Sequence, residues 1–209
     1  MPKRFVIEGE APRAVIEEIA AILRSGGVVI LPTDTIYGFH AAALDAAAVQ
    51  KIFDIKDRSA AKALPILCAN IEQLKAIGAM LDEDVEGFLA ATWPAPLTAV
   101  VAIREPIPAS AGQKTIAARI PALDWLREVT QLTGPIASTS VNKSGSEPLY
   151  STKKIPMEFE SAVNAVVDAG DLAGKASTVV DFTLTPPTLI RTGHHPFTQI
   201  LWKSMRKTL

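Results

Sequence analysis

The chain has few cysteines and histidines, and this limits the chemistry open to it. Its single cysteine, Cys68, excludes an internal disulfide and any metal site built from several cysteines. His194 and His195 are adjacent, so their side chains diverge and make a poor metal pair, while His40 has no partner at ligand spacing. No Gly-x-Ser-x-Gly turn accompanies the three histidines. The sequence therefore disfavours covalent hydrolase chemistry.

An excess of charge and a long apolar run are also absent. The chain has 21 lysines and arginines and 22 aspartates and glutamates, a formal net charge of −1. This argues against a globally basic nucleic-acid binder, which needs surplus cations to displace counterions, although a local basic cleft stays open. The longest uncharged stretch, residues 88–103, contains two prolines and is shorter than the ~20 residues of a membrane helix. With no signal peptide at the start, we expect a cytoplasmic protein without membrane contact.

Neither of two common glycine-rich nucleotide motifs is intact. GDLAGK at 170–175 has three rather than four residues between its glycines, and Ala176 stands where a P-loop has serine or threonine. We interpret this segment as a turn between strands. No Gly-x-Gly-x-x-Gly segment exists, so a dinucleotide-binding Rossmann site is unsupported.

What the chain does have is an ordinary globular composition, with 48% hydrophobic and 21% charged residues over 209 positions. A chain of this length buries roughly 70% of its unfolded surface, and we expect one domain over residues 1–209. Apolar patterning predicts strands over 5–7, 28–31, 64–68, 97–103, 116–120, 136–139, 163–167, 178–181 and 189–190. It predicts helices around 15–23, 49–56, 70–73, 85–89 and 123–129, and a terminal helix within 197–207. This alternation indicates an α/β fold with a mixed sheet and helices packed outside it.

The run VVIL at 28–31 is continuously apolar and β-branched, which is typical of a strand buried on both faces. Pro32 ends it, so Thr33, Asp34 and Thr35 follow its carboxyl end. This is where α/β sheets place their ligands.

A group of cations follows the helix expected at 49–56. Lys56 and Arg58 point the same way if the chain is extended there, and Lys62 lies just beyond. Such a group suits a polyphosphate, because arginine offers a bidentate fork and lysine a point charge. The alternative is a solvated helix end that favours cations through its dipole.

A loop rich in hydroxyl groups follows the strand expected at 136–139. Ser138, Ser140 and Asn142 can hydrogen-bond phosphate oxygens or a base edge, and Gly145 allows close approach of the backbone. The alternative is a plain Ser/Asn turn.

Two arginines adjoin apolar strands. Arg119 lies within IAARI at 116–120 and Arg191 follows Leu189 and Ile190. Because arginine is rarely buried without a partner, each either faces solvent or points into a cleft to hold an anion. Cys68 ends an apolar strand and is interpreted as inert core.

Six short segments follow one another along the chain: PTDTIYG at 32–38, KDR at 56–58, WPAPLT at 93–98, ARIP at 118–121, SVNKSG at 140–145 and STVVD at 177–181. In this order and spacing they resemble the YrdC-like family of threonylcarbamoyl-AMP synthases. The resemblance covers about residues 14–196, and we expect 197–209 to form a terminal helix or tail. Long members of the family carry an extra C-terminal domain, and we expect this chain to be a short form without it.

The resemblance implies a twisted α/β sheet around a concave, positively charged cleft. It also implies a reaction in which L-threonine, bicarbonate or CO2, and ATP give threonylcarbamoyl-AMP and pyrophosphate. Mg2+ would accompany the ATP rather than occupy a protein cage. A transferase complex would then modify adenosine 37 of tRNA, with at most weak tRNA contact by this chain.

The resemblance also assigns residues. Lys56 and Arg58 would be catalytic, since fixed cations stabilise the charge that develops during phosphoryl transfer. Positions expected at ATP are Lys56, Arg58, Lys62, Thr115, Ser140, Asn142 and Arg191. Positions expected at L-threonine are Thr35, Leu67, Arg119, Ser138 and Ser177, with Arg119 pairing with the carboxylate.

Some positions depart from the family pattern: Ser59 replaces a proline, Ala95 a glycine, Phe39-His40 a Leu-Gly, and Leu67 a frequent histidine. Two alternatives therefore stay open. One is a relative that adenylates a different carbamate. The other is a double-stranded RNA or tRNA-binding module that uses the same basic cleft, although a net charge of −1 weakens it.

Overall fold

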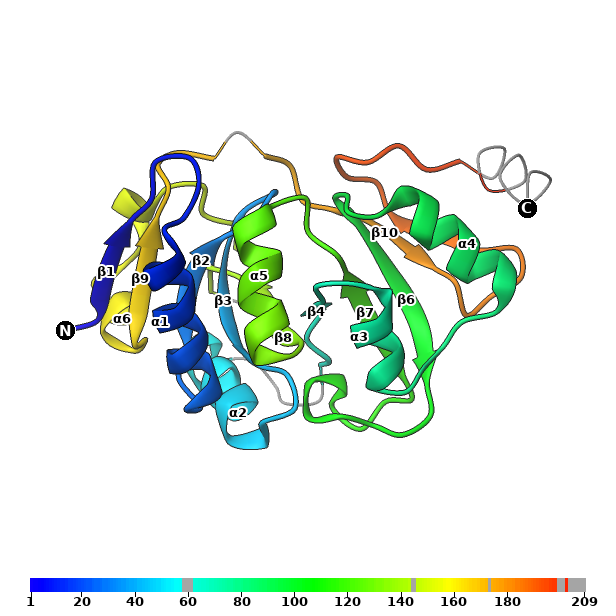
Figure 1. Ribbon diagram of the computed structural model, residues 1–209, viewed down its shortest axis with the longest axis horizontal. Coiled ribbons are helices and arrows are strands. Elements are labelled where there is room, and N and C mark those ends of the chain that lie inside the picture. Colours follow the sequence, from blue (N-terminus) through cyan, green and yellow to red (C-terminus); the bar gives the residue numbers. More distant parts are fainter. Residues whose placement is uncertain (58–61, 144–145, 173, 199–201, 203–209) are drawn as a thin grey trace.

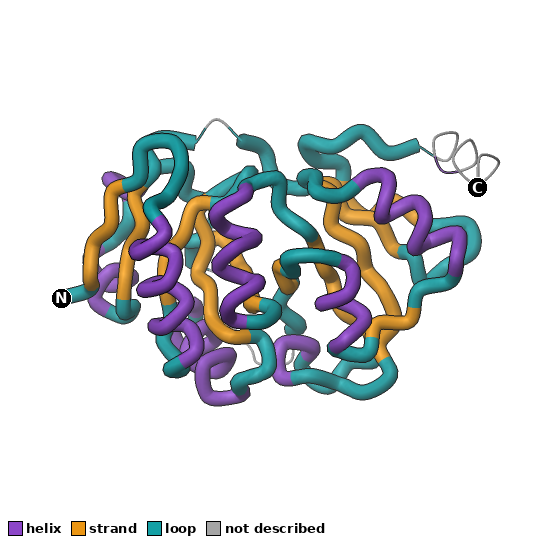
Figure 2. The backbone as a smooth tube through the Cα atoms, in the orientation of Figure 1, coloured by secondary structure: helices purple, strands orange, loops and turns teal. Residues whose placement is uncertain are grey.

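One mixed sheet organises the protein (Figures 1 and 2). The computed structural model describes residues 1–57, 62–143, 146–172, 174–198 and 202. Within them, 11 strands form one sheet in the order β1-β9-β2-β3-β8-β4-β7-β6-β10-β11, and β5 pairs with β6. The strands are β1 (Lys3–Val6), β2 (Val29–Pro32), β3 (Tyr37–Ala42), β4 (Ile66–Leu67), β5 (Ala79–Met80), β6 (Leu97–Ile103), β7 (Thr115–Arg119), β8 (Ile136–Ser140), β9 (Ala165–Asp168), β10 (Thr178–Asp181) and β11 (Thr188–Arg191).

Parallel and antiparallel pairs both occur, as the sequence predicts. β9 runs parallel to β1 and β2, β4 runs parallel to β7, and β6 runs parallel to β10. The pairs β2–β3, β3–β8, β4–β8 and β6–β7 are antiparallel. The helices are α1 (Arg13–Arg24), α2 (Ala46–Lys56), α3 (Ile71–Ala76), α4 (Glu83–Thr92), α5 (Asp124–Thr133) and α6 (Met157–Ser161), with short 3-10 turns at Pro108–Ser110 and Thr152–Lys154.

β2 is buried on both faces, which confirms the interpretation of its apolar run. Val29 and Leu31 belong to the core beneath α1 and α5, whereas Ile30 belongs to the larger core on the opposite side. Figure 1 shows α1 and α5 side by side across the strands, and buried residues of both helices join this smaller core. Alternation along an extended strand explains the division, since successive side chains point to opposite faces.

The larger core also collects most of the few aromatic rings. It includes buried residues of α2, α3 and α4 and Phe159 of α6. Phe88, Phe182, Phe197 and Trp202 form one cluster in which centroids of contacting rings lie 5.3–6.2 Å apart. Apart from Phe197, Thr198 and Trp202, the expected terminal helix lies outside the described residues.

Several elements differ from the sequence prediction. β3, β5 and α6 were not expected. In β3 only Tyr37 and Phe39 favour a strand, and they are mixed with glycine, histidine and alanines, while β5 and α6 are short. β3 is instead held between β2 and β8. β4 is shorter than 64–68, since Pro65 has no N–H to donate to a ladder. Among the described residues, no helix has the length and apolar character needed to cross a bilayer.

One connection spans almost the whole sheet. β9 is second in the strand order and β10 is ninth, so the connection between them, described at residues 169–172 and 174–177, leads from one end of the molecule toward the other (Figure 1). Gly174 passes very close to the chain after β2, because a Cβ at this position would lie 2.0 Å from the Thr35 carbonyl oxygen. No larger residue fits there without movement of the backbone. The GDLAGK segment is therefore part of a long crossover rather than a turn between adjacent strands.

Candidate functional site

A cavity of about 370 Å3 lies where several strands end. Its walls come from the segment after β2 and from β3, β4, β7, β8, β10 and β11. Seven of the twelve positions expected at ATP or L-threonine line this one cavity, although they are far apart in the sequence. These seven are Thr35, Leu67, Arg119, Ser138, Ser140, Ser177 and Arg191.

Arg119 is a buried charge in the wall of this cavity. It is the last residue of β7, is 6% exposed, and lines the cavity rather than facing solvent. Its Nη1 donates to Asp34 Oδ1 at 2.5 Å, and its Nη2 lies 3.4 Å from Thr35 Oγ1. Asp34 Oδ2 accepts from the backbone N–H of Ala122 at 3.1 Å. Burial lowers the pKa of the Arg119 guanidinium, and the carboxylate of Asp34 opposes this shift.

Several hydroxyl groups line the same cavity as Arg119. Thr33 Oγ1 lies 2.8 Å from Thr35 Oγ1 and accepts from the backbone N–H of Thr35 and Ile36, which fixes the turn after β2. Across the cavity, Thr98 Oγ1 lies 2.8 Å from Ser177 Oγ. The cavity thus combines one buried cation with several hydroxyls, which is a surface suited to a carboxylate or phosphate ligand.

Arg191 closes the β11 side of the cavity. Its Nε and Nη2 donate to the Ser177 carbonyl oxygen at 3.1 and 2.8 Å, and Nη2 also lies 3.2 Å from Ser177 Oγ. Partial burial lowers the pKa of this guanidinium. These bonds use only some of the five N–H groups of the Arg191 guanidinium, so this cation remains able to contact an anion in the cavity.

Lys56 lies behind the cavity, at the C-terminal end of α2. Its ammonium donates to the carbonyl oxygens of Ser140 and Asn142 at 2.5 and 2.8 Å and to Asn142 Oδ1 at 2.7 Å. Lys56 is 3% exposed, and Ser140 Oγ donates to the same amide oxygen at 2.7 Å. The lysine therefore fixes the segment that follows β8. The Lys56 ammonium is bound to this segment and does not line the cavity.

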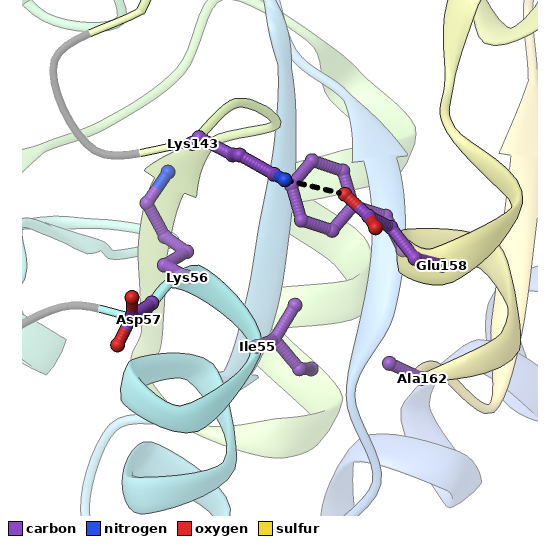
Figure 3. A pocket seen from close by; sticks show the side chains of 7 residues that line it. Ile55, Lys56, Asp57, Lys143, Glu158 and Ala162 are labelled. Carbon is purple, nitrogen blue, oxygen red and sulfur yellow. Dashed lines mark ion pairs between the residues drawn. The ribbon is translucent and has the colours of Figure 1, made fainter.

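A second hollow, of about 510 Å3, lies on the other side of that segment (Figure 3). Lys56 extends along one wall from the end of α2. On the opposite wall, Lys143 forms an ion pair of 3.1 Å with Glu158 of α6. Residues 140–143 thus separate two hollows, with Ser140 on the first and Lys143 on the second.

Three of the other expected positions, Lys62, Thr115 and Asn142, lie at the margin of the site. Lys62 is exposed and precedes Ala63, which lines the cavity. Thr115 is half-buried at the first position of β7, on the same strand face as Arg119 but beyond the cavity wall. Asn142 contacts Lys56 instead of lining the cavity. Arg58 lies outside the described residues.

Sequence analysis placed Thr33 and Asp34 at the ligand-binding edge of the sheet but did not predict their contacts, and it missed Thr98. In the structure Asp34 binds Arg119, Thr33 fixes Thr35, and Thr98 contacts Ser177. Thr98 stands inside the recognised segment WPAPLT. The contact of Asp34 could have been predicted from the rule that a buried arginine needs an opposite charge.

The described residues contain no group of three or more histidine, cysteine, aspartate or glutamate side chains that could hold a metal ion. Asp34, the carboxylate beside the cavity, already has both oxygens in hydrogen bonds. The side chains that line the cavity therefore do not fit a protein-bound metal.

A family model, two related sequences and a solved structure all match this chain. The Sua5/YciO/YrdC family model, described as telomere recombination, matches residues 21–193. A threonylcarbamoyl-AMP synthase of Pyrococcus abyssi is 36% identical over 87% of this chain and 54% of that protein, and one of Bacillus subtilis is 31% identical over 85% and 53%. A crystal structure of P. abyssi Sua5 with L-threonine matches with a TM-score of 0.87 and 33% identity, over 94% of this chain and 59% of that one. The chain thus spans about half the length of these relatives.

Proposed function

Because the chain belongs to the Sua5/YciO/YrdC family, we propose that it is a threonylcarbamoyl-AMP synthase, which converts L-threonine, bicarbonate or CO2, and ATP into threonylcarbamoyl-AMP and pyrophosphate. One observation carries the proposal beyond family membership. Seven expected ligand positions from separate parts of the chain meet in one cavity around a buried arginine. The L-threonine bound to a related Sua5 gives the amino acid class.

L-Threonine is expected beside Arg119. Asp34 occupies Nη1, while Nη2 has only a 3.4 Å contact with Thr35, so this side of the fork is available to a carboxylate. Ser138 and Ser177 offer hydroxyls to the polar groups of the substrate, and Leu67 offers an apolar surface to its methyl group. Burial strengthens such charge-assisted bonds, because the effective dielectric constant is lower than in water.

ATP is expected on the side of Ser140 and Arg191. Lys56 acts there by holding the 140–142 segment, and Arg58, Lys62, Thr115 and Asn142 remain expectations from the resemblance. Mg2+ would arrive with the triphosphate, and no step is assigned to it.

The chemistry requires charge control rather than a protein nucleophile. The threonine nitrogen forms a bond to the carbon of CO2 and loses a proton, giving a carbamate. A carbamate oxygen then attacks the α-phosphorus, the bond to the β-phosphate breaks, and pyrophosphate leaves with its electron pair. Fixed cations stabilise the charge that develops in this step, which suits Arg191 and the lysines expected at ATP.

We place this reaction in the cytoplasm, as the supplier of an activated group to a transferase complex that modifies tRNA. Direct contact with tRNA would be weak, because the formal net charge is −1.

The test is turnover by the purified chain. The protein is incubated with ATP, labelled bicarbonate and a panel of amino acids, and pyrophosphate is measured together with label in the adenylate. We expect threonine-dependent release, a raised KM for L-threonine in Ser177→Ala, and no change in Ser25→Ala, an exposed serine at the end of α1. Release without amino-acid preference would support the relative that adenylates another carbamate. Absence of turnover with salt-sensitive retention of RNA would support the RNA-binding module.

A further inference from the structure

A buried imidazole lies beneath the cavity wall. His40 is a residue of β3, is fully buried, and pairs in register with Ser138 of β8. Its Nε2 lies 3.1 Å from Ser138 Oγ, and Ser138 lines the cavity while His40 does not. The histidine therefore contacts the site through one hydroxyl group.

The ring is fixed in place by its surroundings. Gly38, two residues earlier on the same face of β3, lines the cavity directly, and a Cβ there would lie 2.8 Å from His40 Cε1. The absence of a side chain at Gly38 thus makes room for the imidazole under the cavity floor. A fully buried ring between two strands has little rotational freedom.

The ring is also uncharged. Burial lowers the pKa of His40 to about 3, and the positive charge of Arg119 acts in the same direction. A neutral imidazole has one donor and one acceptor nitrogen, and either tautomer can hydrogen-bond a hydroxyl. Near neutral pH the contact is therefore a constant hydrogen bond rather than a proton relay.

We infer that His40 is a positioning residue for L-threonine, which acts by fixing the direction of the Ser138 hydroxyl at the cavity wall. A serine hydroxyl rotates to suit its partners, so without His40 it would lose its fixed direction toward the substrate. This inference rests on the proposed function for the identity of the ligand. The contact between His40 and Ser138 does not depend on that function.

A double-mutant cycle tests the inference. We expect His40→Phe and Ser138→Ala each to raise the KM for L-threonine about tenfold, with the KM for ATP nearly unchanged. In the double variant the KM for L-threonine should also rise about tenfold rather than a hundredfold, because both changes remove the same interaction. His40→Gln should recover most of the loss, and His194→Gln, an exposed histidine, should match the parent protein. Additive losses, or a normal KM in His40→Phe, would overturn the inference.

A second measurement needs neither substrate nor a folded His40 variant. In protein labelled with 15N on histidine, Ser138→Ala should shift the imidazole nitrogen resonances of His40, while Ser25→Ala should not. Unchanged His40 resonances in Ser138→Ala would refute the contact. If the parent protein released no pyrophosphate with L-threonine, the proposed function would be wrong. The histidine nitrogen spectrum would still test the contact between His40 and Ser138.

Discussion

At the scale of single residues, the site depends on charges and polar groups that satisfy one another before any ligand binds. Arg119 has Asp34, Asp34 has the Ala122 N–H, and Ser138 has His40. These bonds fix the directions of the groups that the substrate is expected to meet. Preorganisation of this kind lowers the cost of ordering the site on binding.

Removal of the Asp34 charge tests the buried ion pair. Asp34→Asn leaves the buried guanidinium of Arg119 without its counter-charge, and we expect a loss of roughly 3 kcal/mol in the free energy of unfolding. Urea denaturation measures it. The control is Glu86→Gln, which removes an exposed partner of Lys75 and should cost less than about 1 kcal/mol. Equal losses of unfolding free energy in Asp34→Asn and Glu86→Gln would contradict the prediction that the buried ion pair matters more than the exposed one.

The neutral state of His40 predicts a pH dependence of stability. Its pKa is about 3 in the folded protein and about 6.5 when unfolded, so between these values only the unfolded chain binds the proton. Stability is unaffected by this group above pH 6.5 and falls as the pH drops through the window, by up to roughly 1.4 kcal/mol per pH unit. Urea denaturation at pH 7, 6 and 5 should give a smaller slope for His40→Gln than for the parent protein. Parallel slopes would show that folding does not lower the pKa of His40.

At the scale of elements, the segment after β8 lies between the two hollows, and Lys56 anchors it from α2. The anchor determines where the Ser140 hydroxyl lies, and with it the part of the cavity expected to bind ATP. A helix terminus thereby controls a loop that is distant in the sequence.

Lys56→Met tests this anchor. The change leaves three oxygens of Ser140 and Asn142 without their ammonium donor, and each loss of a buried partner costs roughly 1–3 kcal/mol if nothing replaces it. We expect faster hydrogen exchange at residues 140–143 and a KM for ATP raised at least about tenfold, with a smaller change for L-threonine. Lys51→Met is the matched control, since Lys51 lies on the same helix and donates instead to the Gly26 carbonyl oxygen. Equal effects on both substrates would contradict the role given to the anchor.

Some helices and strands could be predicted from the sequence, and others could not. β6 matches its predicted range because its apolar run is long, and α1 was found from its apolar face. β3 was missed because its strand character comes from its neighbours β2 and β8, and a single sequence does not display pairing. Arg119 was recognised as a candidate anion ligand because an arginine within an apolar strand segment is visible in the local sequence. Asp34 and His40 acquire their roles only through contacts across the sheet.

At the scale of the whole molecule, both halves of the sheet contribute to one cavity. β3 and β8 supply one wall, and β7 and β10 supply another. A ligand that touches both walls therefore stabilises the entire sheet rather than one end of it.

Ligand binding should raise the melting temperature in a single transition. A ligand present at 100 times its Kd adds about 2.7 kcal/mol to the stability of the folded state, which corresponds to roughly 5–10 °C for a chain of this size. We expect this shift with L-threonine and ATP together, measured by calorimetry or circular dichroism. L-Valine, which lacks the hydroxyl, should give a smaller shift. Two separate transitions, of which only one moves, would show that the ligands stabilise just one part of the sheet.

The crossover from β9 to β10 also has a consequence for synthesis on the ribosome. Arg191 lies in β11 and Ser177 directly precedes β10, the last two strands of the chain. The connection after β9 must first pass across strands formed from earlier parts of the chain. A nascent chain that has emerged only as far as β9 lacks one wall of the pocket, so it has no complete place for either substrate. The proposed activity would therefore be acquired late in translation, and we expect prematurely released fragments neither to consume nucleotide nor to sequester amino acid.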